Sequence, residues 1–486
     1  MADSNDRILK GPLPWEVLRF GFPLALGMAL QNAFNLVDAY LINQLPFAEA
    51  NAAVGAIGVC DQLAAIGSIV SYGISTATAT LISQQKGAGD EEGVRRTAWQ
   101  SIWLVGFLSL FFAILGVFAP VLAENVIGLK GAVLDVAIRY LRIILPGGFS
   151  MFFLLHLGSI QRALGSAKTP VALLVLGNVL NVFFAVIWLY GPEAPNATLA
   201  WGAKIAAAIG VPKKGMEGAA WATVLARTLA LLPNIVILVK RFSILPKDHR
   251  GPDFGEMKRI LHIAWPSSAQ FVLRICAVLL TSSLVARYYS TDQDQAATTA
   301  MGLVFRLDTI AMFVAMGWGS AAQTFVGQNL GAKAEKRATS SGWITVLYDG
   351  ITNVGIYAGV LSFGERFLRY FGKDDHAIRI ALEYVAIVAP SYFLIGPAIV
   401  LGNAMAGAGA TKTTLKLDAG VLLGFQLPVS LICVLAVHVP LRGLFACVSA
   451  TALCGAIVYV IAYARGRWKD HAHKTLPPVA PPAEAV

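Results

Sequence analysis

The chain has 486 residues, of which 56% are hydrophobic and only 14% are charged, and its formal net charge is +10. Soluble domains carry about 25% charged residues, so this composition excludes a soluble protein. The basic excess does not indicate nucleic-acid binding, because the bases lie in loops between long apolar runs, where membrane orientation and lipid headgroups account for them. Apolar runs of roughly 20 residues, long enough to cross a bilayer as helices, recur throughout. The predicted class is an all-α polytopic membrane protein.

Taken in chain order, the apolar runs predict twelve transmembrane helices. Lysine and arginine gather in the connections on one side, whereas the connections after spans 1, 3, 7 and 11 carry few bases. The positive-inside rule places the basic side, and with it both termini, in the cytoplasm of a cell membrane. The predicted spans lie near residues 16–42, 52–83, 95–122, 133–160, 169–190, 217–240, 258–289, 296–328, 338–363, 378–405, 414–437 and 443–465.

An internal repeat divides the chain. A shift of 244 residues aligns pairs such as Gly73/Gly317 and Gln84/Gln328, and one residue of slippage also brings Pro23 onto Pro266. Each half holds six spans, an even number, so both halves have the same orientation and are related by an axis along the membrane normal. Secondary transporters built in this way bind substrate between the halves. The predicted units are a cytoplasmic N-terminus (1–15), an N-terminal six-helix bundle (16–240), a cytoplasmic linker (241–257), a C-terminal six-helix bundle (258–466) and a disordered cytoplasmic tail (467–486).

The first predicted span contains a single carboxylate, Asp38, in the segment NAFNLVDAYLIN (32–43). No other acid or base occurs between Arg19 and the end of that apolar run at Ile42. A charged side chain at the centre of a lipid-exposed helix costs about 2.5–3.5 kcal/mol. Asp38 is therefore expected to face the bundle interior, with a hydrogen bond from Asn35 one helical turn away. It is the candidate proton-binding residue, and the alternative role is a hydrogen bond between helices.

Other polar residues within the spans are candidates for the substrate cavity. Asn178 and Asn181 in span 5 are expected either to complete a polar chamber with Asp38 or to act as packing contacts between helices. Gln323 in span 8 is expected to line the cavity. His156 in span 4 is interpreted as an interior histidine whose hydrogen bonds are satisfied.

Span 8 also carries Arg306 and Asp308, which lie two residues apart and therefore on different helix faces. One of them is expected to pair with a neighbour such as Arg274 in span 7. Such a contact would be either a buried ion pair or a substrate-sensing site. Asp349 and Asp418 are expected near the ends of spans 9 and 11, where their side chains can reach polar surroundings.

Several segments resemble one family, the multidrug and toxic compound extrusion (MATE) transporters, and within it the DinF-like branch. NLVDAYLINQLP is similar to the family's N-x-x-D pattern in the first span. GISTATATLISQQKGAGD and GWGSAAQTFVGQNLGAKAEKRA resemble the paired ends of spans 2 and 8, and QRALGSAKTP and NAMAGAGATKT the paired loops after spans 4 and 10. The resemblance covers nearly all of residues 15–466. It implies two six-helix bundles that form a V and export organic cations or other drugs against proton or sodium entry.

Two departures from the family pattern bear on the coupling ion. Asn181 matches a family asparagine, but the acid that many members carry four residues later is Ala185 here. Where the sodium-coupled branch has a glutamate, eight residues after the span-7 proline, this chain has Arg274. Both departures favour coupling through Asp38 and argue against that branch's cation site in the C-terminal half.

Prolines inside four predicted spans are candidate hinges for alternating access, because each interrupts the helical hydrogen bonding. They are Pro23, Pro146, Pro266 and Pro390. The predicted function is antiport of small amphipathic or cationic organic compounds against protons. The carrier is expected to be a monomer with no metal and no cofactor besides its coupling ion.

Other functions stay open from sequence alone. One is a drug antiporter coupled to Na⁺ instead of H⁺. Another is a lipid-precursor flippase of the same superfamily: twelve spans weigh against it, since such relatives have more, whereas Arg274 and Arg306 favour it, since their cavity is cationic. A membrane enzyme or receptor would need clustered catalytic residues or a regulatory domain, and the sequence contains neither. The expected partners are a small-molecule substrate and the lipid bilayer, without nucleic acid.

Overall fold

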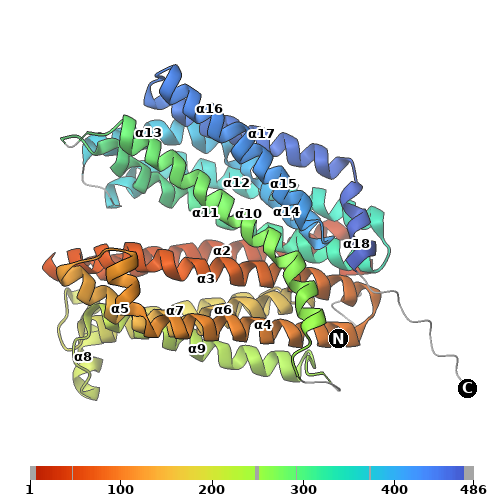
Figure 1. Ribbon diagram of the computed structural model, residues 1–486, viewed down its shortest axis with the longest axis horizontal. Coiled ribbons are helices and arrows are strands. Elements are labelled where there is room, and N and C mark those ends of the chain that lie inside the picture. Colours follow the sequence, from red (N-terminus) through yellow and green to blue (C-terminus); the bar gives the residue numbers. More distant parts are fainter. Residues whose placement is uncertain (1–6, 46, 247–250, 292, 372–373, 476–486) are drawn as a thin grey trace, which may run out of the picture.

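The computed structural model describes residues 7–45, 47–246, 251–291, 293–371 and 374–475. Within these ranges every regular element is a helix, and twelve helices are long and apolar enough to cross a membrane. The predicted fold class and number of spans are confirmed. Figure 1 shows two groups of helices, one from each half of the chain, which meet at the end of the molecule that carries both termini and diverge toward the opposite end.

The N-terminal half forms the lower bundle in Figure 1. α3 packs against α6, α7 packs against α9, and α2 lies between α7 and the other half. The short helix α8 (Ala200–Ile209) lies in the connection between α7 and α9, at the end away from the termini. The six spanning helices are α2 (Leu13–Asn43), α3 (Phe47–Ala88), α4 (Glu91–Val117), α6 (Gly131–Ala163), α7 (Lys168–Tyr190) and α9 (Gly215–Lys240).

The C-terminal half forms the upper bundle, in which α11 contacts α12, α13 and α14. α10 begins at Phe254, four residues before the predicted start of the C-terminal bundle at residue 258. Two of its six spans are interrupted helices: span 10 consists of α13 and α14, and span 11 contains α15 and α16. The helices are α10 (Phe254–Tyr288), α11 (Ala296–Gly331), α12 (Glu335–Phe371), α13 (Asp375–Val388), α14 (Tyr392–Gly407), α15 (Thr411–Val421), α16 (Leu427–Leu431) and α17 (Leu441–Ala464).

The interruptions follow from local sequence. A 3₁₀ turn at Ala389–Ser391 separates α13 from α14 and contains Pro390, which lacks the N–H that a continuous α-helix needs. Span 11 has π-helical turns at Leu422–Gln426 and Ile432–Ala436. The other three predicted hinge prolines, Pro23, Pro146 and Pro266, lie inside continuous helices. Their role as hinges stays a prediction.

The two halves are joined by contacts that repeat with the internal symmetry. On α3, Gln84 donates a hydrogen bond from Nε2 to the carbonyl oxygen of Gly407 at 2.8 Å. On α11, Gln328 donates in the same way to the carbonyl oxygen of Ala163 at 2.7 Å. Both the two donors and the two acceptors are 244 residues apart, so one contact is the symmetry copy of the other.

Two glycines allow this close approach. A Cβ atom at Gly87 would overlap the carbonyl oxygen of Gln328, and a Cβ at Gly331 would overlap that of Gln84. This explains why the Gln-x-x-Gly pattern occurs in both halves: the glutamine bridges to the other half and the glycine makes room for the glutamine's counterpart. These four residues are called the interlobe seal below. They lie at the end of the molecule that carries the termini.

The end of the chain differs from the prediction of disorder. Residues Arg467–Lys469 and Asp470–Thr475 form short helices. Trp468 is buried, stacks on Tyr463 with ring centroids 4.6 Å apart, and donates from Nε1 to the Tyr463 carbonyl oxygen at 2.9 Å. The predicted disorder is wrong for residues 467–475, because burial of the tryptophan orders this segment against the bundle. The remainder of the tail lies outside the described residues.

Candidate functional site

Asp38 lies on α2 and faces α7 within the N-terminal bundle. Asn181 donates through its single amide nitrogen to both carboxylate oxygens, at 2.9 and 2.8 Å. The side-chain oxygen of Asn181 in turn accepts a hydrogen bond from the Thr223 hydroxyl of α9 at 3.1 Å. The chain of contacts Asp38–Asn181–Thr223 therefore ties three helices together, and the structure brings together Asp38 and Asn181 as predicted.

A second polar contact joins the same two helices closer to the seal, two turns away along α2 and one turn away along α7. Asn178 on α7 donates to the side-chain oxygen of Gln31 on α2 at 2.9 Å. Gln31 donates to Asn35 at 3.2 Å. The expected hydrogen bond between Asn35 and Asp38 is therefore wrong: Asn35 is turned toward Gln31, and Asn181 from the neighbouring helix takes its place. We refer to the contacts Asp38–Asn181 and Gln31–Asn178 as the upper and lower rungs between α2 and α7.

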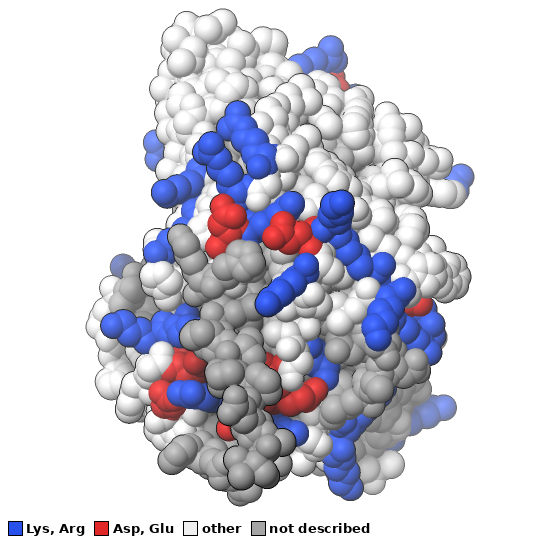
Figure 2. Space-filling model, turned by 90° about the vertical axis from the view of Figure 1, so that its right-hand side faces the viewer, with Lys and Arg blue, Asp and Glu red and all other residues white. Residues whose placement is uncertain are grey.

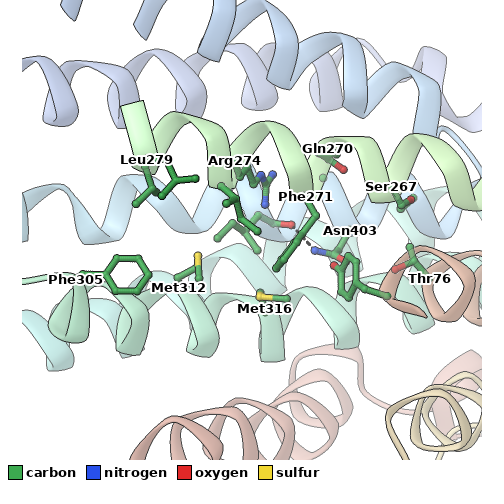
Figure 3. Close-up of a pocket in the computed structure, with 16 residues that line it drawn as sticks. Thr76, Ser267, Gln270, Phe271, Arg274, Leu279, Phe305, Met312, Met316 and Asn403 are labelled. Atoms are coloured by element: carbon green, nitrogen blue, oxygen red, sulfur yellow. Dashed lines mark hydrogen bonds between the residues drawn. The ribbon is translucent and has the colours of Figure 1, made fainter. Parts of the chain in front are cut away.

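Three neighbouring hollows lie between and within the halves. The N-side cavity, about 280 Å³, is lined by residues of α2, α3, α6, α7 and α9 together with α11 and α14. The central cavity, about 190 Å³, lies mainly between α10, α11 and α14 (Figure 3). It shares Tyr72, Thr76, Met316 and Asn403 with the N-side cavity. The C-side cavity, about 270 Å³, lies within the C-terminal bundle and shares Arg274, Phe305 and Met312 with the central cavity, so the three hollows are neighbours.

The walls of the three hollows are mostly apolar, but each of them includes charged side chains. Figure 3 shows Met312, Met316 and Phe305 of α11 facing Arg274 and Phe271 of α10 across the central cavity. Methionine and aromatic side chains adapt to ligands of varied shape. An apolar hollow with a few placed polar groups is the usual form of a small-molecule site.

Arg274 is paired with Asp418 of α15, Nε to Oδ2, at 2.7 Å. The other oxygen of Asp418 accepts from the Tyr459 hydroxyl at 2.6 Å, and Tyr459 also accepts from Gln270. The expected pairing of Arg274 with the charges of span 8 is therefore wrong, as is the expected position of Asp418 at a polar span end. Both errors have one cause: α15 packs against α10 and brings the buried carboxylate to the arginine.

Asp308 is held by two tyrosines. Its oxygens accept hydrogen bonds from Tyr384 at 2.5 Å and from Tyr392 at 2.8 Å, and it lines the C-side cavity. Arg306 points elsewhere, with its guanidinium 5.0 Å from the ring centroid of Phe371. The two residues thus lie on different faces as predicted, but Arg306 does not line any of the three hollows.

Gln323 and His156, two further positions singled out from the sequence, have different outcomes. Gln323 borders the N-side cavity, but its amide donates to the Thr76 carbonyl oxygen and the Thr80 hydroxyl, which joins the halves beside the seal. His156 is fully buried between the hydroxyls of Ser75 and Ser101, as an interior histidine should be. 

Asp349 is fully buried. It accepts a hydrogen bond from Asn353, one turn along α12. The prediction that it reaches polar surroundings at a span end is wrong.

Comparison with known proteins identifies the family. The family model described as MatE matches the chain twice, over residues 23–187 and 266–432, once in each half. The chain belongs to the MATE family. It is thus a membrane transporter and not an enzyme. The two matches also coincide with the internal repeat. The narrower assignment to the DinF-like branch stays a prediction.

Relatives of this MATE transporter cover most of its length. A probable multidrug resistance protein, YpnP of Bacillus subtilis, is 26% identical over 405 residues, which are 83% of this chain and 84% of the relative. A probable multidrug resistance protein NorM of Thermotoga maritima is 23% identical over 94% of this chain and 93% of its own. A solved structure, described as the outward-facing conformation of a multidrug resistance MATE family transporter, superposes with a TM-score of 0.83 at 21% identity, covering 96% of this chain and 98% of that one.

Sequence reasoning missed two residues of this MATE transporter's cavity, Arg162 and Arg227. Both line the N-side cavity. Arg162 lies in the last turn of α6, where the sequence pattern does not distinguish it from the bases of the cytoplasmic connections. Arg227 stands in the middle of α9, in the segment WATVLARTLALL, and an arginine isolated in an apolar span is a signal that could have found it.

Proposed function

We propose that the protein exports small amphipathic organic compounds from the cytoplasm in exchange for protons, by alternating access. Asp38 binds the proton. The observation that carries this proposal is the pair of rungs between α2 and α7: the upper one holds the only carboxylate of α2's apolar stretch, and the lower one, Gln31–Asn178, lines the N-side cavity.

Protonation of Asp38 changes what the upper rung can do. An ionised carboxylate accepts through both oxygens, which suits the Asn181 amide that donates to both. A protonated carboxyl has one oxygen that carries a hydrogen, so one of these contacts is lost and the hydroxyl needs an acceptor of its own. α2 then shifts against α7, and the lower rung shifts with it. In this way a proton at Asp38 alters the wall of the substrate cavity without entering it.

The direction of transport is supported by charge and shape. Figure 2 views the end of the molecule that carries the termini, and lysine and arginine side chains gather there. α3, α6 and α9 each carry a basic residue in the last turn at this end: Lys86, Arg162 and Lys240. By the positive-inside rule this is the cytoplasmic end. The halves meet at this end and diverge at the other, which corresponds to an outward-facing state.

The test uses the purified transporter in proteoliposomes with an imposed pH gradient. Asp38→Asn keeps the shape of the side chain but cannot be deprotonated, so efflux of a dye driven by the pH gradient should fall at least tenfold at equal reconstitution. Asp135→Asn, which removes an exposed acid of α6, is the matched control and should leave efflux unchanged. A sodium gradient at equal pH is the second arm. Sodium-driven efflux, or an Asp38→Asn variant as active as the parent protein, would contradict the proposal.

A further inference from the structure

We propose that the N-side cavity recognises the anionic group of an amphiphilic substrate, a carboxylate, sulfonate or phosphate, and that Arg162 supplies the charge that binds it. The inference rests on the proposed function only in taking this cavity as part of the transport path. It names the class of substrate: an organic anion, in place of the organic cation that the resemblance to the family implies.

The charged side chains that line the N-side cavity, among the residues that the structure describes, are all of one sign. Two guanidinium groups line it, Arg162 from α6 and Arg227 from α9, and no carboxylate does among the lining residues that the structure describes. The remaining polar lining consists of amides and hydroxyls, which include Gln31, Asn178 and Ser320. Amide N–H and hydroxyl groups can donate to an anion, and a low-dielectric wall strengthens the field of the two arginines. Arg227 interacts electrostatically with Asp38, which does not line the hollow, so Arg162 is the guanidinium whose charge would repel an organic cation here.

Arg162 is directed into the hollow instead of toward the membrane surface. Its Nη1 lies 3.5 Å from the position that a Cβ would occupy on Gly158, one turn back along α6, so the guanidinium lies beside the helix within the cavity wall. Glycine at 158 leaves the room for it. Among the described residues no carboxylate forms an ion pair with Arg162.

Two structural roles for Arg162 fit the geometry less well. An arginine in the last turn of a helix often bonds the final carbonyl groups, but this guanidinium lies back along α6, away from them. A scaffold role shared by the two halves is also disfavoured. The repeat places Ala406 at the equivalent position of the C-terminal half, where it lines the central cavity with a methyl group alone.

The position of Arg162 also suits a transport cycle. The next residue, Ala163, accepts the hydrogen bond of Gln328 in the interlobe seal. When the seal opens toward the cytoplasm, Arg162 is among the first cavity residues exposed to it, and a guanidinium there can capture a carboxylate or phosphate through two parallel hydrogen bonds. Met28, Met151, Phe313 and Met316 line the same hollow and accommodate the apolar part of the ligand.

The experiment compares two probes that differ in charge alone: 4-(1-pyrenyl)butyrate and 4-(1-pyrenyl)butyltrimethylammonium. Their binding to the full-length protein is measured by fluorescence in phosphatidylcholine nanodiscs, without any ion gradient. The butyrate should bind at least tenfold more tightly than the ammonium compound. Arg162→Gln should weaken butyrate binding at least tenfold, whereas Arg162→Lys, which keeps the charge, should stay within about threefold of the parent protein. Arg142→Gln removes an exposed arginine of the same helix and serves as the control.

The inference is overturned if the cation binds as tightly as the butyrate, if the butyrate does not bind, or if Arg162→Gln binds it like the parent protein. Nanodiscs that contain phosphatidylglycerol identify the source of the anionic group. If this lipid competes with the butyrate for binding, the natural ligand is a lipid headgroup. If it does not compete, the natural ligand is a compound taken from solution. Because no gradient is present, failure of proton coupling leaves this result intact. Conversely, proton-driven efflux of a cationic dye by the parent protein, at a rate that Arg162→Gln leaves unchanged, would keep the proposed function and remove the inference.

Discussion

At the scale of single residues, Arg274 and Asp418 of the C-terminal half form a pair whose charges cancel. Asp418 has both oxygens occupied, one by Arg274 and one by Tyr459, and its side chain is 7% exposed, against 29% for Arg274. Breaking a buried pair by neutralising one partner is far more costly than the pair is stabilising, because the other charge is left uncompensated. Stability is therefore retained best when both charges are kept or both are removed.

Asp418→Asn should consequently lower the free energy of unfolding by about 3 kcal/mol, the lower end of the range for buried pairs, because Arg274 is partly exposed. The double variant Asp418→Asn, Arg274→Gln should recover part of this loss. The measurement is chemical unfolding in one detergent for all variants. Asp375→Asn, in an exposed pair with Arg369, is the control and should cost at most about 1 kcal/mol. A double variant whose loss equals the sum of the single losses would show that the pair is not coupled.

Asp38 and its partner Asn181 could be predicted from the sequence because both interrupt apolar spans. A polar side chain within the membrane needs a second polar group as its hydrogen-bond partner. It failed for contacts made between helices that are distant in sequence. Helical periodicity tells which residues share a face of their own helix, so Asn35 was the natural candidate partner for Asp38. It does not tell which helix packs opposite, so the pairing of Arg274 with Asp418 across α10 and α15 was out of reach.

At the scale of elements, the interlobe seal links α3 to α14 and α11 to α6 by one repeated contact. The number of helices and the parallel repeat were predictable, because the hydropathy of each span and the fixed 244-residue offset can both be read directly from the sequence. The seal itself was not, although its Gln-x-x-Gly pattern was visible twice. A conserved offset shows that two segments are equivalent, but only the packing shows that each glutamine reaches the backbone of the opposite half.

Gly87→Ala should open the seal, because the added methyl group would overlap the carbonyl oxygen of Gln328 with backbone on both sides. The expected result is a population shift toward a state in which the two halves separate at this end. It can be measured as a longer distance between spin labels placed at the N-terminal ends of α4 and α12, beside the seal. Gly106→Ala on α4 is the matched control, since nothing lies within 4 Å of its added Cβ. Unchanged distances in Gly87→Ala would show that the seal tolerates the methyl group and does not hold the halves together.

At the scale of the whole molecule, the charge of the substrate decides how the membrane potential acts. Exchange of one monocation for one proton moves no net charge. Export of one monoanion against one entering proton moves two positive charges inward, and each is worth about 2.3 kcal/mol per 100 mV. At 100 mV this amounts to about 4.6 kcal/mol, or roughly a thousandfold in the attainable concentration ratio.

Efflux of pyrenebutyrate from proteoliposomes at equal pH on both sides should therefore accelerate when potassium and valinomycin make the cytoplasmic side negative. Collapse of the potential should return the rate to its starting value, with empty liposomes reporting passive leakage. An efflux rate that does not respond to the potential would contradict one-for-one exchange of an anion for a proton.

The chemistry of the interlobe seal has one more consequence. Its described hydrogen bonds join glutamine amides to backbone carbonyl oxygens, and neither group gains or loses a proton between pH 5 and 8. The strength of these hydrogen bonds in the interlobe seal therefore does not depend on pH in this range. In the proposed mechanism the sensor of acidity is Asp38, which lies in a different part of the molecule and acts through the packing of α2. A carrier built in this way can alter its pH response by changes in one helix pair while its gate remains untouched.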